Sequence, residues 1–202
     1  FLGRPDDTPA GDAFERRLYV CRRTIEKKAD AEFALRNKIF YVCSMSSRTI
    51  VYKGMLVATQ MRRFFIDLND AAVKTAVALV HSRYSTNTTP SWERAHPNRF
   101  IIHNGEINTI KGNTDAMLAR EESISSPILQ DDMNKILPII NTSGSDSAML
   151  DNALEFMVMN GMDLPLAVMI TIPEPWANNK TMSQSKKDFY QYYLYQQWGL
   201  QH

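Results

Sequence analysis

Residues 81–113 read HSRYSTNTTPSWERAHPNRFIIHNGEINTIKGN, and the fold prediction starts from this stretch. The apolar segment Ala76–His81 that leads into it is typical of a buried strand. Residues 85–98 are rich in Thr, Asn and Pro and lack periodicity, which predicts a long ordered loop of the kind that often carries function. A second strand is predicted at Arg99–His103, and a turn then leads into a helix at Ile107–Glu122.

Outside this stretch, the pattern predicts two further helices, a hairpin and a buried strand. The helices are expected at Phe14–Ala34 and from an N-cap at Ser145 or Asp146 to Gly161. The remaining elements are a hairpin of Ile39–Ser44 and Thr49–Tyr52, a partly helical stretch at Met61–Leu68, and a strand at Leu166–Ile172. Because strands and helices are mixed without strict βαβ alternation, we predict an α+β fold.

The composition is that of an ordinary globular protein. Of 202 residues, 44% are hydrophobic and 22% are charged, which favours one sizeable core over two small ones. The 23 basic and 22 acidic residues give a net charge of +1, which excludes a broad electrostatic footprint for nucleic acid or a membrane surface. The densest basic stretch, Arg16–Lys28, is interpreted as the solvated face of a helix.

Two cysteines, Cys21 and Cys43, lack the spacing of a metal site or a redox motif. This usage favours a reducing cytosolic or organellar compartment. Neither a signal sequence nor a run of about 18 apolar residues is present, so no membrane segment is predicted. The chain begins with Phe1 and reads as an internal fragment of a longer protein.

Three polar clusters lie where predicted strands end or helices begin. In the first, Arg83 follows the strand that ends at His81. The planar guanidinium of arginine suits a carboxylate in a bidentate pair, so Arg83 is a candidate for binding the α-carboxylate of a ligand. An internal ion pair explains the same residue equally well.

The other two clusters are His103–Glu106 and Gly144–Ser147. The side-chain amide of Asn104 and the N–H of Gly105 can supply two donors to an oxyanion, although an Asn-Gly turn with positive φ angles is the simpler interpretation. Asp146 can accept a hydrogen bond from a substrate ammonium group, although capping of the following helix is the default interpretation. The histidines show no metal-ligand spacing, which argues against metal-dependent hydrolysis.

Taken whole, residues 81–113 strongly resemble the class II glutamine amidotransferase domain of glutamate synthases. The resemblance extends to FYVCSMSSRTIVYKGM at 40–55, LPII at 137–140, GSDSA at 144–148 and IPEPW at 172–176. It covers residues 13–191, so we expect one partial amidotransferase domain there, after a loop at 1–12 and before a divergent end at 192–202.

The resemblance implies an N-terminal-nucleophile hydrolase fold, in which two antiparallel sheets lie between helical layers as a four-layer α/β/β/α sandwich. It also implies a role for each polar cluster. Arg83 binds the α-carboxylate of glutamine, with Thr86 nearby in the pocket. Asn104 and Gly105 form the oxyanion hole, and Asp146 binds the α-amino group.

In that family, a mature N-terminal cysteine attacks the glutamine amide, and its own α-amino group acts as the general base. In this chain Cys21 and Cys43 have their amide nitrogens within the chain, so neither has a free amine. The nucleophile is therefore expected to be absent from this chain, and the isolated chain is expected to be inactive.

The resemblance implies that the parent enzyme hydrolyses L-glutamine to glutamate and ammonia, for the reductive amination of 2-oxoglutarate in glutamate biosynthesis. No cofactor is expected in this segment, whereas FMN and an iron–sulfur cluster are implied for the parent. The implied partners are L-glutamine, the downstream synthase domains of the same polypeptide and a small NAD(P)H-oxidising subunit. The implied location is the cytoplasm or the plastid stroma.

Two alternatives stay open. The glutamine site belongs to another class II enzyme, such as amidophosphoribosyltransferase, glucosamine-6-phosphate synthase or asparagine synthetase, or the chain is a non-catalytic glutamine-binding fragment.

Overall fold

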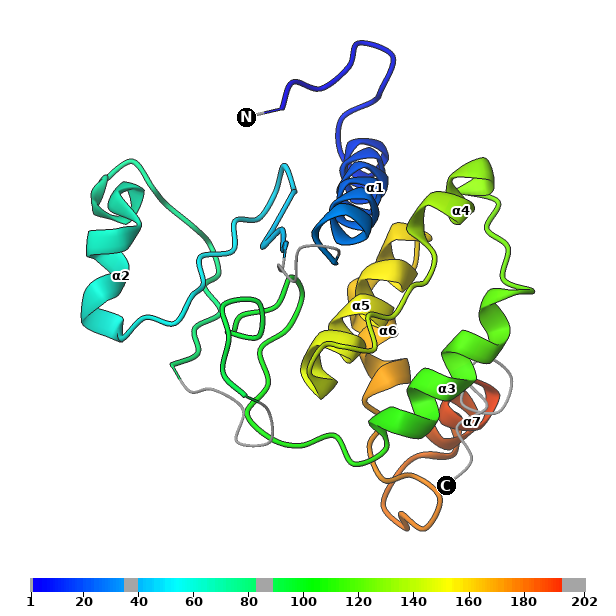
Figure 1. Ribbon diagram of the computed structural model, residues 1–202. Helices are drawn as coiled ribbons and strands as arrows, with labels where there is room; N and C mark the ends of the chain where they lie inside the picture. Colours follow the sequence, from blue (N-terminus) through cyan, green and yellow to red (C-terminus); the bar gives the residue numbers. More distant parts are fainter. Residues whose placement is uncertain (1, 35–39, 83–88, 194–202) are drawn as a thin grey trace. The chain divides into compact units, whose positions relative to one another are not determined.

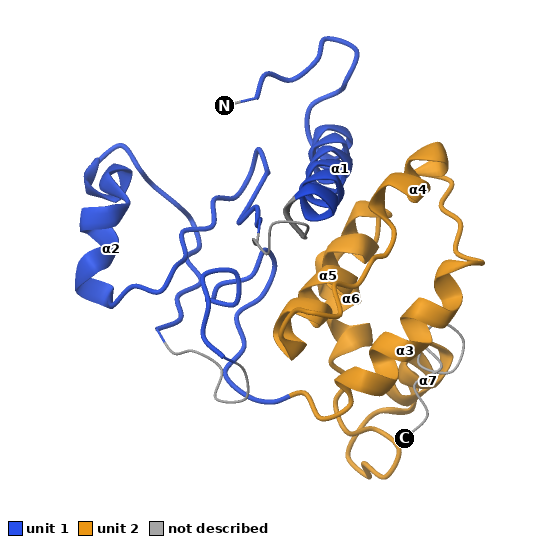
Figure 2. Ribbon diagram, viewed as in Figure 1, with its two compact units in different colours: residues 1–106 blue, residues 107–202 orange. Residues whose placement is uncertain are grey.

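The computed structural model describes residues 2–34, 40–82 and 89–193, and the chain divides into two compact units (Figures 1 and 2). Unit 1 is Phe1–Glu106 and unit 2 is Ile107–His202. The composition favoured one main core, so the division into two is a finding of the structure. The expected domain bounds at 13–191 stay a prediction.

Unit 1 combines one long helix with extended loops. Helix α1 spans Asp12–Ala34, α2 spans Ala58–Phe64, and the short 3-10 helix η1 spans Ile66–Asn69 and packs on α2. The predictions of a helix at 14–34 and of a partly helical stretch at 61–68 are thereby confirmed. Gly11, with φ of +85°, turns the chain into α1, and its carbonyl accepts the N–H of Glu15.

The basic stretch of α1 is not uniformly solvated. Arg22 is only 2% exposed, and its guanidinium donates to both carboxylate oxygens of Glu26 at 2.9 and 2.8 Å. Nitrogens of Arg23 and Arg99 lie 3.2 and 3.1 Å from the same carboxylate. The prediction of a solvated face is wrong for Arg22, because a carboxylate one turn away compensates for the desolvation of its charge.

Unit 2 is built around helix α5, Asp146–Met159, which packs against α6, Leu164–Thr171, and α3, Ile110–Glu121 (Figure 1). Leu154 of α5 and Ile170 of α6 are fully buried in this core. The remaining elements are η2 at Gln130–Asp132, α4 at Met133–Ile136 and α7 at Gln184–Tyr193. The predicted helices at 107–122 and 145–161 are confirmed as α3 and α5.

Both ends of α5 follow local sequence signals. Ser145 is the N-cap, and its side chain accepts the N–H of Ala148. At the other end, Gly161 has φ of +88° and donates its N–H to Val158, while Met162 donates to Met157. This pair of bonds is a Schellman motif, which requires a residue in the left-handed region and therefore favours glycine.

The strand predicted at Leu166–Ile172 is wrong, because these residues form α6 and its C-cap. A short apolar run does not distinguish a buried strand from a helix by periodicity alone. Pro165 lies in the first turn, where its fixed φ angle suits a helix. Ala167 and Ile170 are buried three positions apart, whereas Met169 and Ile172 are exposed, which is a helical pattern.

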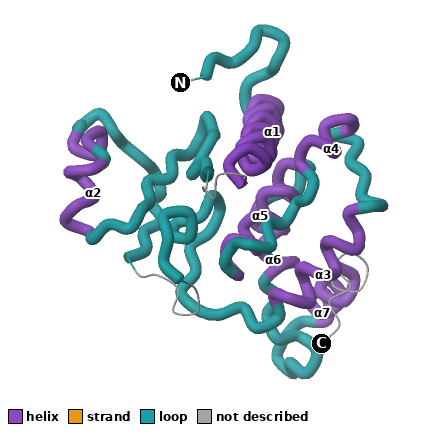
Figure 3. Tube along the Cα trace, in the orientation of Figure 1, coloured by secondary structure: helices purple, strands orange, loops and turns teal. Residues whose placement is uncertain are grey.

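The other predicted strands are also absent from the described residues, which contain helices and loops only (Figure 3). A strand needs a neighbouring chain for its backbone groups, and here the bonds are local. The N–H of Val51 binds the side chain of Ser44, and the N–H of Asn98 binds the carbonyl of Ile101. Val77 and Val80 are 74% and 77% exposed, so this apolar segment is not buried.

The four-layer α/β/β/α sandwich with two antiparallel sheets is therefore wrong for the residues that the structure describes. The failed strands are those expected at residues 40–44, 49–52, 76–81 and 99–103. Residue 39, which the first of them also included, lies outside the described residues. Within the described ranges, no helix is both long enough and apolar enough to cross a membrane.

Candidate functional site

The predicted residues Arg83 and Thr86 lie outside the described residues. The segment just before them is held by aromatic contact in unit 1, where the rings of His81 and His96 lie 4.6 Å apart. His96 is buried and belongs to the loop at 89–98, which has no regular structure, as predicted for that part of the loop.

The backbone of that loop is fixed by a buried lysine. The Nζ atom of Lys53 donates to the carbonyl of Glu93 at 2.9 Å and to the Tyr41 hydroxyl at 3.0 Å, and it lies 4.3 Å from the centre of the Tyr41 ring. A Cβ atom at Gly54 would lie 2.4 Å from the ring of Trp92, so the close approach of this ring favours glycine. Lys53 was not predicted as part of this region, although it lies in the segment at 40–55 that carries the family resemblance.

Asn104 and Gly105 are both exposed at the end of unit 1. Positive φ angles occur at Gly11 and Gly161 among the described glycines, so the simple explanation of Gly105 as a left-handed turn residue is wrong. A Cβ atom at Gly105 would lie 3.0 Å from Nε2 of His103, which gives a different reason for glycine there. Within the described ranges, neither the Asn104 amide nor the Gly105 N–H donates a hydrogen bond to protein.

Asp146 is the first residue of α5 and is half-buried. Because Ser145 caps the helix, the default explanation of Asp146 as the cap is wrong. The Asp146 carboxylate instead accepts the backbone N–H of Ile107 on Oδ2 at 2.8 Å. On Oδ1 it accepts the N–H and the hydroxyl of Ser147 at 2.6 and 3.1 Å.

The turn before α5 is held from within unit 2. Asn141 receives a hydrogen bond from Ser143 on its side chain, and its own N–H donates to the Asn152 side chain of α5 at 3.0 Å. A Cβ atom at Gly144 would lie 3.1 Å from the Asn141 carbonyl, so the tight turn favours glycine at this position. The turn therefore presents Asp146 from a fixed helix start.

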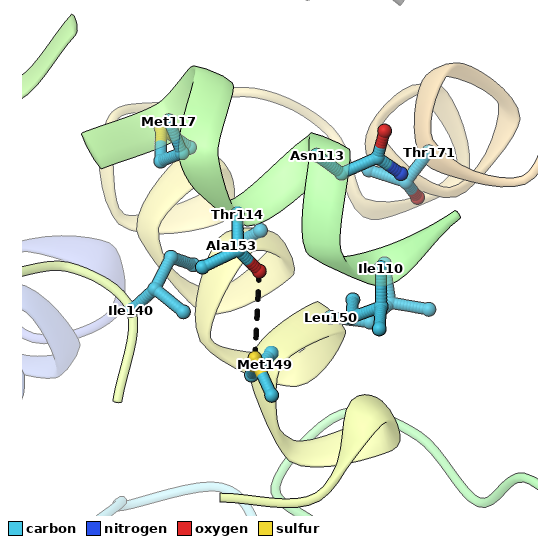
Figure 4. Close-up of a pocket in the computed structure, with 9 residues that line it drawn as sticks. All are labelled: Ile110, Asn113, Thr114, Met117, Ile140, Met149, Leu150, Ala153 and Thr171. Atoms are coloured by element: carbon cyan, nitrogen blue, oxygen red, sulfur yellow. Dashed lines mark hydrogen bonds between the residues drawn. The ribbon is translucent and has the colours of Figure 1, made fainter. Parts of the chain in front are cut away.

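A small cavity of about 30 Å³ lies between α3, α5 and α6 (Figure 4). Thr114 donates to the sulfur of Met149 at 3.4 Å across it, and Met117, Leu150 and Ala153 contribute apolar walls. The volume holds about two water molecules and is too small for an amino acid. This cavity is a packing defect of the core and is not the candidate site.

The described residues contain no group of three or more His, Cys, Asp or Glu side chains that could hold a metal ion. Cys21 is exposed on α1, Cys43 is half-buried, and both are free thiols. Asp146 in unit 2 offers a half-buried carboxylate, and Asn104 and Gly105 in unit 1 offer an exposed side-chain amide and a backbone N–H. Each of these groups can bind a polar ligand. The contact of Ile107 with Asp146 was not predicted, because nothing in a sequence signals a side chain–backbone bond across 39 residues. The local contact of Ser147 with Asp146 was also not predicted.

Comparison with known proteins gives a consistent result. The sequence profile of the class-II glutamine amidotransferases matches residues 1–199. The large chain of the NADPH glutamate synthase of Bacillus subtilis is 51% identical over 193 residues, which are 96% of this chain and 12% of that protein. The NADH glutamate synthase of Schizosaccharomyces pombe is 47% identical over 182 residues, which are 90% of this chain and 8% of that protein.

A ferredoxin-dependent relative matches a similar share of the chain. Ferredoxin-dependent glutamate synthase 1 of Arabidopsis thaliana is 44% identical over 195 residues, which are 95% of this chain and 12% of that protein. The chain thus spans 8–12% of the length of these three relatives. The resemblance that the motifs indicated is confirmed.

Proposed function

The chain belongs to the family of class-II glutamine amidotransferases, and on that premise we propose that it forms the glutamine-binding part of the glutaminase domain of a glutamate synthase. The observation that carries the proposal is the 51% identity, over 193 residues, to the glutamate synthase large chain of Bacillus subtilis. Relatives named for NADPH, NADH and ferredoxin are all similar to this chain, so the similarity does not depend on the electron donor.

The proposal gives each predicted residue one role in binding L-glutamine. The guanidinium of Arg83 pairs with the α-carboxylate, with Thr86 beside it, and the carboxylate of Asp146 accepts from the α-ammonium group. The amide of Asn104 and the N–H of Gly105 donate to the oxygen of the scissile carboxamide. The exposure of Asn104 and Gly105, with donors that are not used within the described protein, supports this assignment.

The bond-breaking step needs a nucleophile that carries its own base. A cysteine thiolate attacks the side-chain carboxamide carbon of glutamine, and the negative charge moves to the oxygen held by Asn104 and Gly105. The C–N bond then breaks, ammonia leaves with a proton from the cysteine's α-amino group, and water hydrolyses the thioester to glutamate. Cys21 and Cys43 have their nitrogens in peptide bonds, so the proposal assigns the nucleophile to neither.

We also propose roles for the other domains of the parent polypeptide, outside these residues. Ammonia released here would aminate 2-oxoglutarate in other domains of the same polypeptide, with electrons delivered through FMN and an iron–sulfur cluster held there. A small NAD(P)H-oxidising subunit is a further partner in this proposal, and the cytoplasm or plastid stroma is the location. The small share of each relative that the chain spans leaves room for such domains.

Calorimetric titration of the chain with L-glutamine tests the proposal. We expect saturable binding, and we expect Arg83→Ala to weaken it by about 10-fold or more, because a charge-assisted bidentate pair contributes about 1.5–3 kcal/mol. Arg48→Ala is the matched control, since Arg48 is an exposed arginine that pairs with Asp12. Equal affinity of Arg83→Ala and the unsubstituted chain would contradict the site assignment.

A further inference from the structure

The two oxygens of the Asp146 carboxylate accept different numbers of hydrogen bonds from the described residues. A carboxylate offers about four lone-pair positions, two on each oxygen. Both positions on Oδ1 are used, by the N–H of Ser147 at 2.6 Å and by its hydroxyl at 3.1 Å. On Oδ2, the described residues supply one donor, the N–H of Ile107 at 2.8 Å.

Because Asp146 lies at the start of a helix, the orientation of its carboxylate matters for the binding of a cationic ligand. Asp146 opens a helix of 14 residues, and the positive end of a helix dipole repels an ammonium group. The carboxylate must offset that repulsion, so its open lone pair has to face the ligand. Ser147 is 3% exposed and lies inside the protein, whereas Asp146 is half-buried and reaches the surface.

We propose that Ser147 is a positioning residue that saturates Oδ1 of Asp146 and thereby directs Oδ2 to the α-ammonium group of glutamine. This inference rests on the proposed function, since it takes the role of Asp146 from it. In this proposal the N–H of Ile107 and the ammonium group of the ligand both donate to Oδ2. Binding of the ammonium group therefore changes the environment of the Ile107 amide. Ile107 follows Gly105 by two residues in the chain.

Ser145 provides a matched control for Ser147. Both serines are 3% exposed, and both lie at the start of α5. The hydroxyl of Ser145 accepts the N–H of Ala148 at 3.2 Å and caps the helix, whereas the hydroxyl of Ser147 donates to Asp146. Ser145→Ala and Ser147→Ala therefore remove the same group at equal burial, and only the second removes a bond to Asp146.

The experiment compares L-glutamine with glutaramate, which keeps the carboxylate and the carboxamide of glutamine but lacks the α-amino group. Calorimetry gives the ratio of the two affinities for each variant. We expect Ser147→Ala to lower this ratio about 5- to 10-fold, and Ser145→Ala to leave it unchanged. An unchanged ratio in Ser147→Ala, or an equal fall in Ser145→Ala, overturns the positioning role.

The variant Asp146→Asn distinguishes failure of the positioning role of Ser147 from failure of the proposed function. If Asp146→Asn abolishes the preference for glutamine and Ser147→Ala does not, the proposed function stands and the positioning role is overturned. If Asp146→Asn keeps the preference, the proposed role of Asp146 fails, and the inference fails with it. The unsubstituted chain gives an independent readout by NMR: glutamine is expected to shift the Ile107 amide resonance more than glutaramate, and equal shifts overturn the proposal.

Discussion

Glu26 forms ion pairs with three arginines among the described residues of unit 1. Its buried carboxylate lies within 3.2 Å of nitrogens of Arg22, Arg23 and Arg99. Glu26→Gln keeps the shape of the side chain but removes the counter-charge that the three arginines share. Because an uncompensated buried charge is costly, we expect the free energy of unfolding in urea to fall by about 3–5 kcal/mol.

Glu32→Gln is the control for this prediction, since Glu32 is an exposed glutamate on the same helix. Interactions of exposed charges contribute little, so its effect should stay below about 1 kcal/mol. Similar losses in the two variants would show that Glu26 acts through general helix stability and not through its buried ion pairs.

The sequence was most informative about the individual residues of the candidate site. The motif pattern led to Asn104, Gly105 and Asp146 and to a family that the comparisons confirm. The reasons for these residue types were not predictable, because they depend on distances. Gly105 does not have a positive φ angle but lies close to the His103 ring, and Asp146 is held by Ile107 from 39 positions away.

Helices were predicted better than other elements because their signals are local. The caps and breakers of α1 and α5 lie within a few residues of the helix ends, so Gly11, Ser145 and Gly161 mark them in the sequence. Strands depend on a distant partner, and the segments at 49–52 and 76–81 satisfy strand patterns without having one in the described residues. The apolar run of α6 was misassigned because its length and periodicity fit a buried strand as well as a helix.

Asp30 lies near the end of α1, where a negative charge is unfavourable with respect to the helix dipole. Burial raises the pKa of Asp30 above its ordinary value of 3.8, the charge of Glu26 raises it further, and the charge of Arg23 lowers it. A carboxyl whose folded-state pKa is raised loses its stabilising contribution as the pH rises through that pKa. Asp30→Asn should therefore raise the free energy of unfolding at neutral pH by about 0.5 kcal/mol.

The same substitution at the other end of α1 should have the opposite sign. Asp12 lies in the first turn, where the helix dipole favours a negative charge, and it pairs with Arg48 at 2.5 Å. Urea unfolding of Asp12→Asn and Asp30→Asn measures both effects. The gain in Asp30→Asn should fade as the pH falls well below 3.8, the ordinary pKa, because the aspartate then becomes protonated in both states. A gain that persists there would exclude ionisation as its cause.

At the scale of the whole molecule, the two units differ in secondary structure and in the interactions that stabilise them. Unit 1 consists mainly of loops fixed by buried polar groups such as Lys53 and the Glu26 pairs, whereas unit 2 is a helical core around Leu154. The first kind of structure depends on specific partners, and the second depends on the burial of apolar surface. Local sequence signals predicted α3 and α5 of unit 2, whereas α4 and α7 were not predicted and α6 was predicted as a strand.

Glutamine should stabilise the chain as a whole if the proposed function holds. A ligand that binds only the folded state raises the free energy of unfolding by RT ln(1 + [L]/Kd), or about 2.7 kcal/mol at about 100 times Kd. We therefore expect millimolar L-glutamine to raise the midpoint of thermal unfolding of the chain and of Ser145→Ala. Asp146→Asn should show a much smaller rise at the same concentration, because the α-ammonium group loses its counter-charge.

D-glutamine is the control for this effect, since it has the same groups in a mirror-image arrangement. If Arg83, Asp146 and Asn104 have the proposed roles, D-glutamine should bind more weakly, because the configuration at its α-carbon is inverted. An equal rise with both enantiomers would indicate a solvent effect and contradict the site. A midpoint that rises with L-glutamine alone, and that does not rise in Asp146→Asn, would show that the folded chain contains a formed glutamine site.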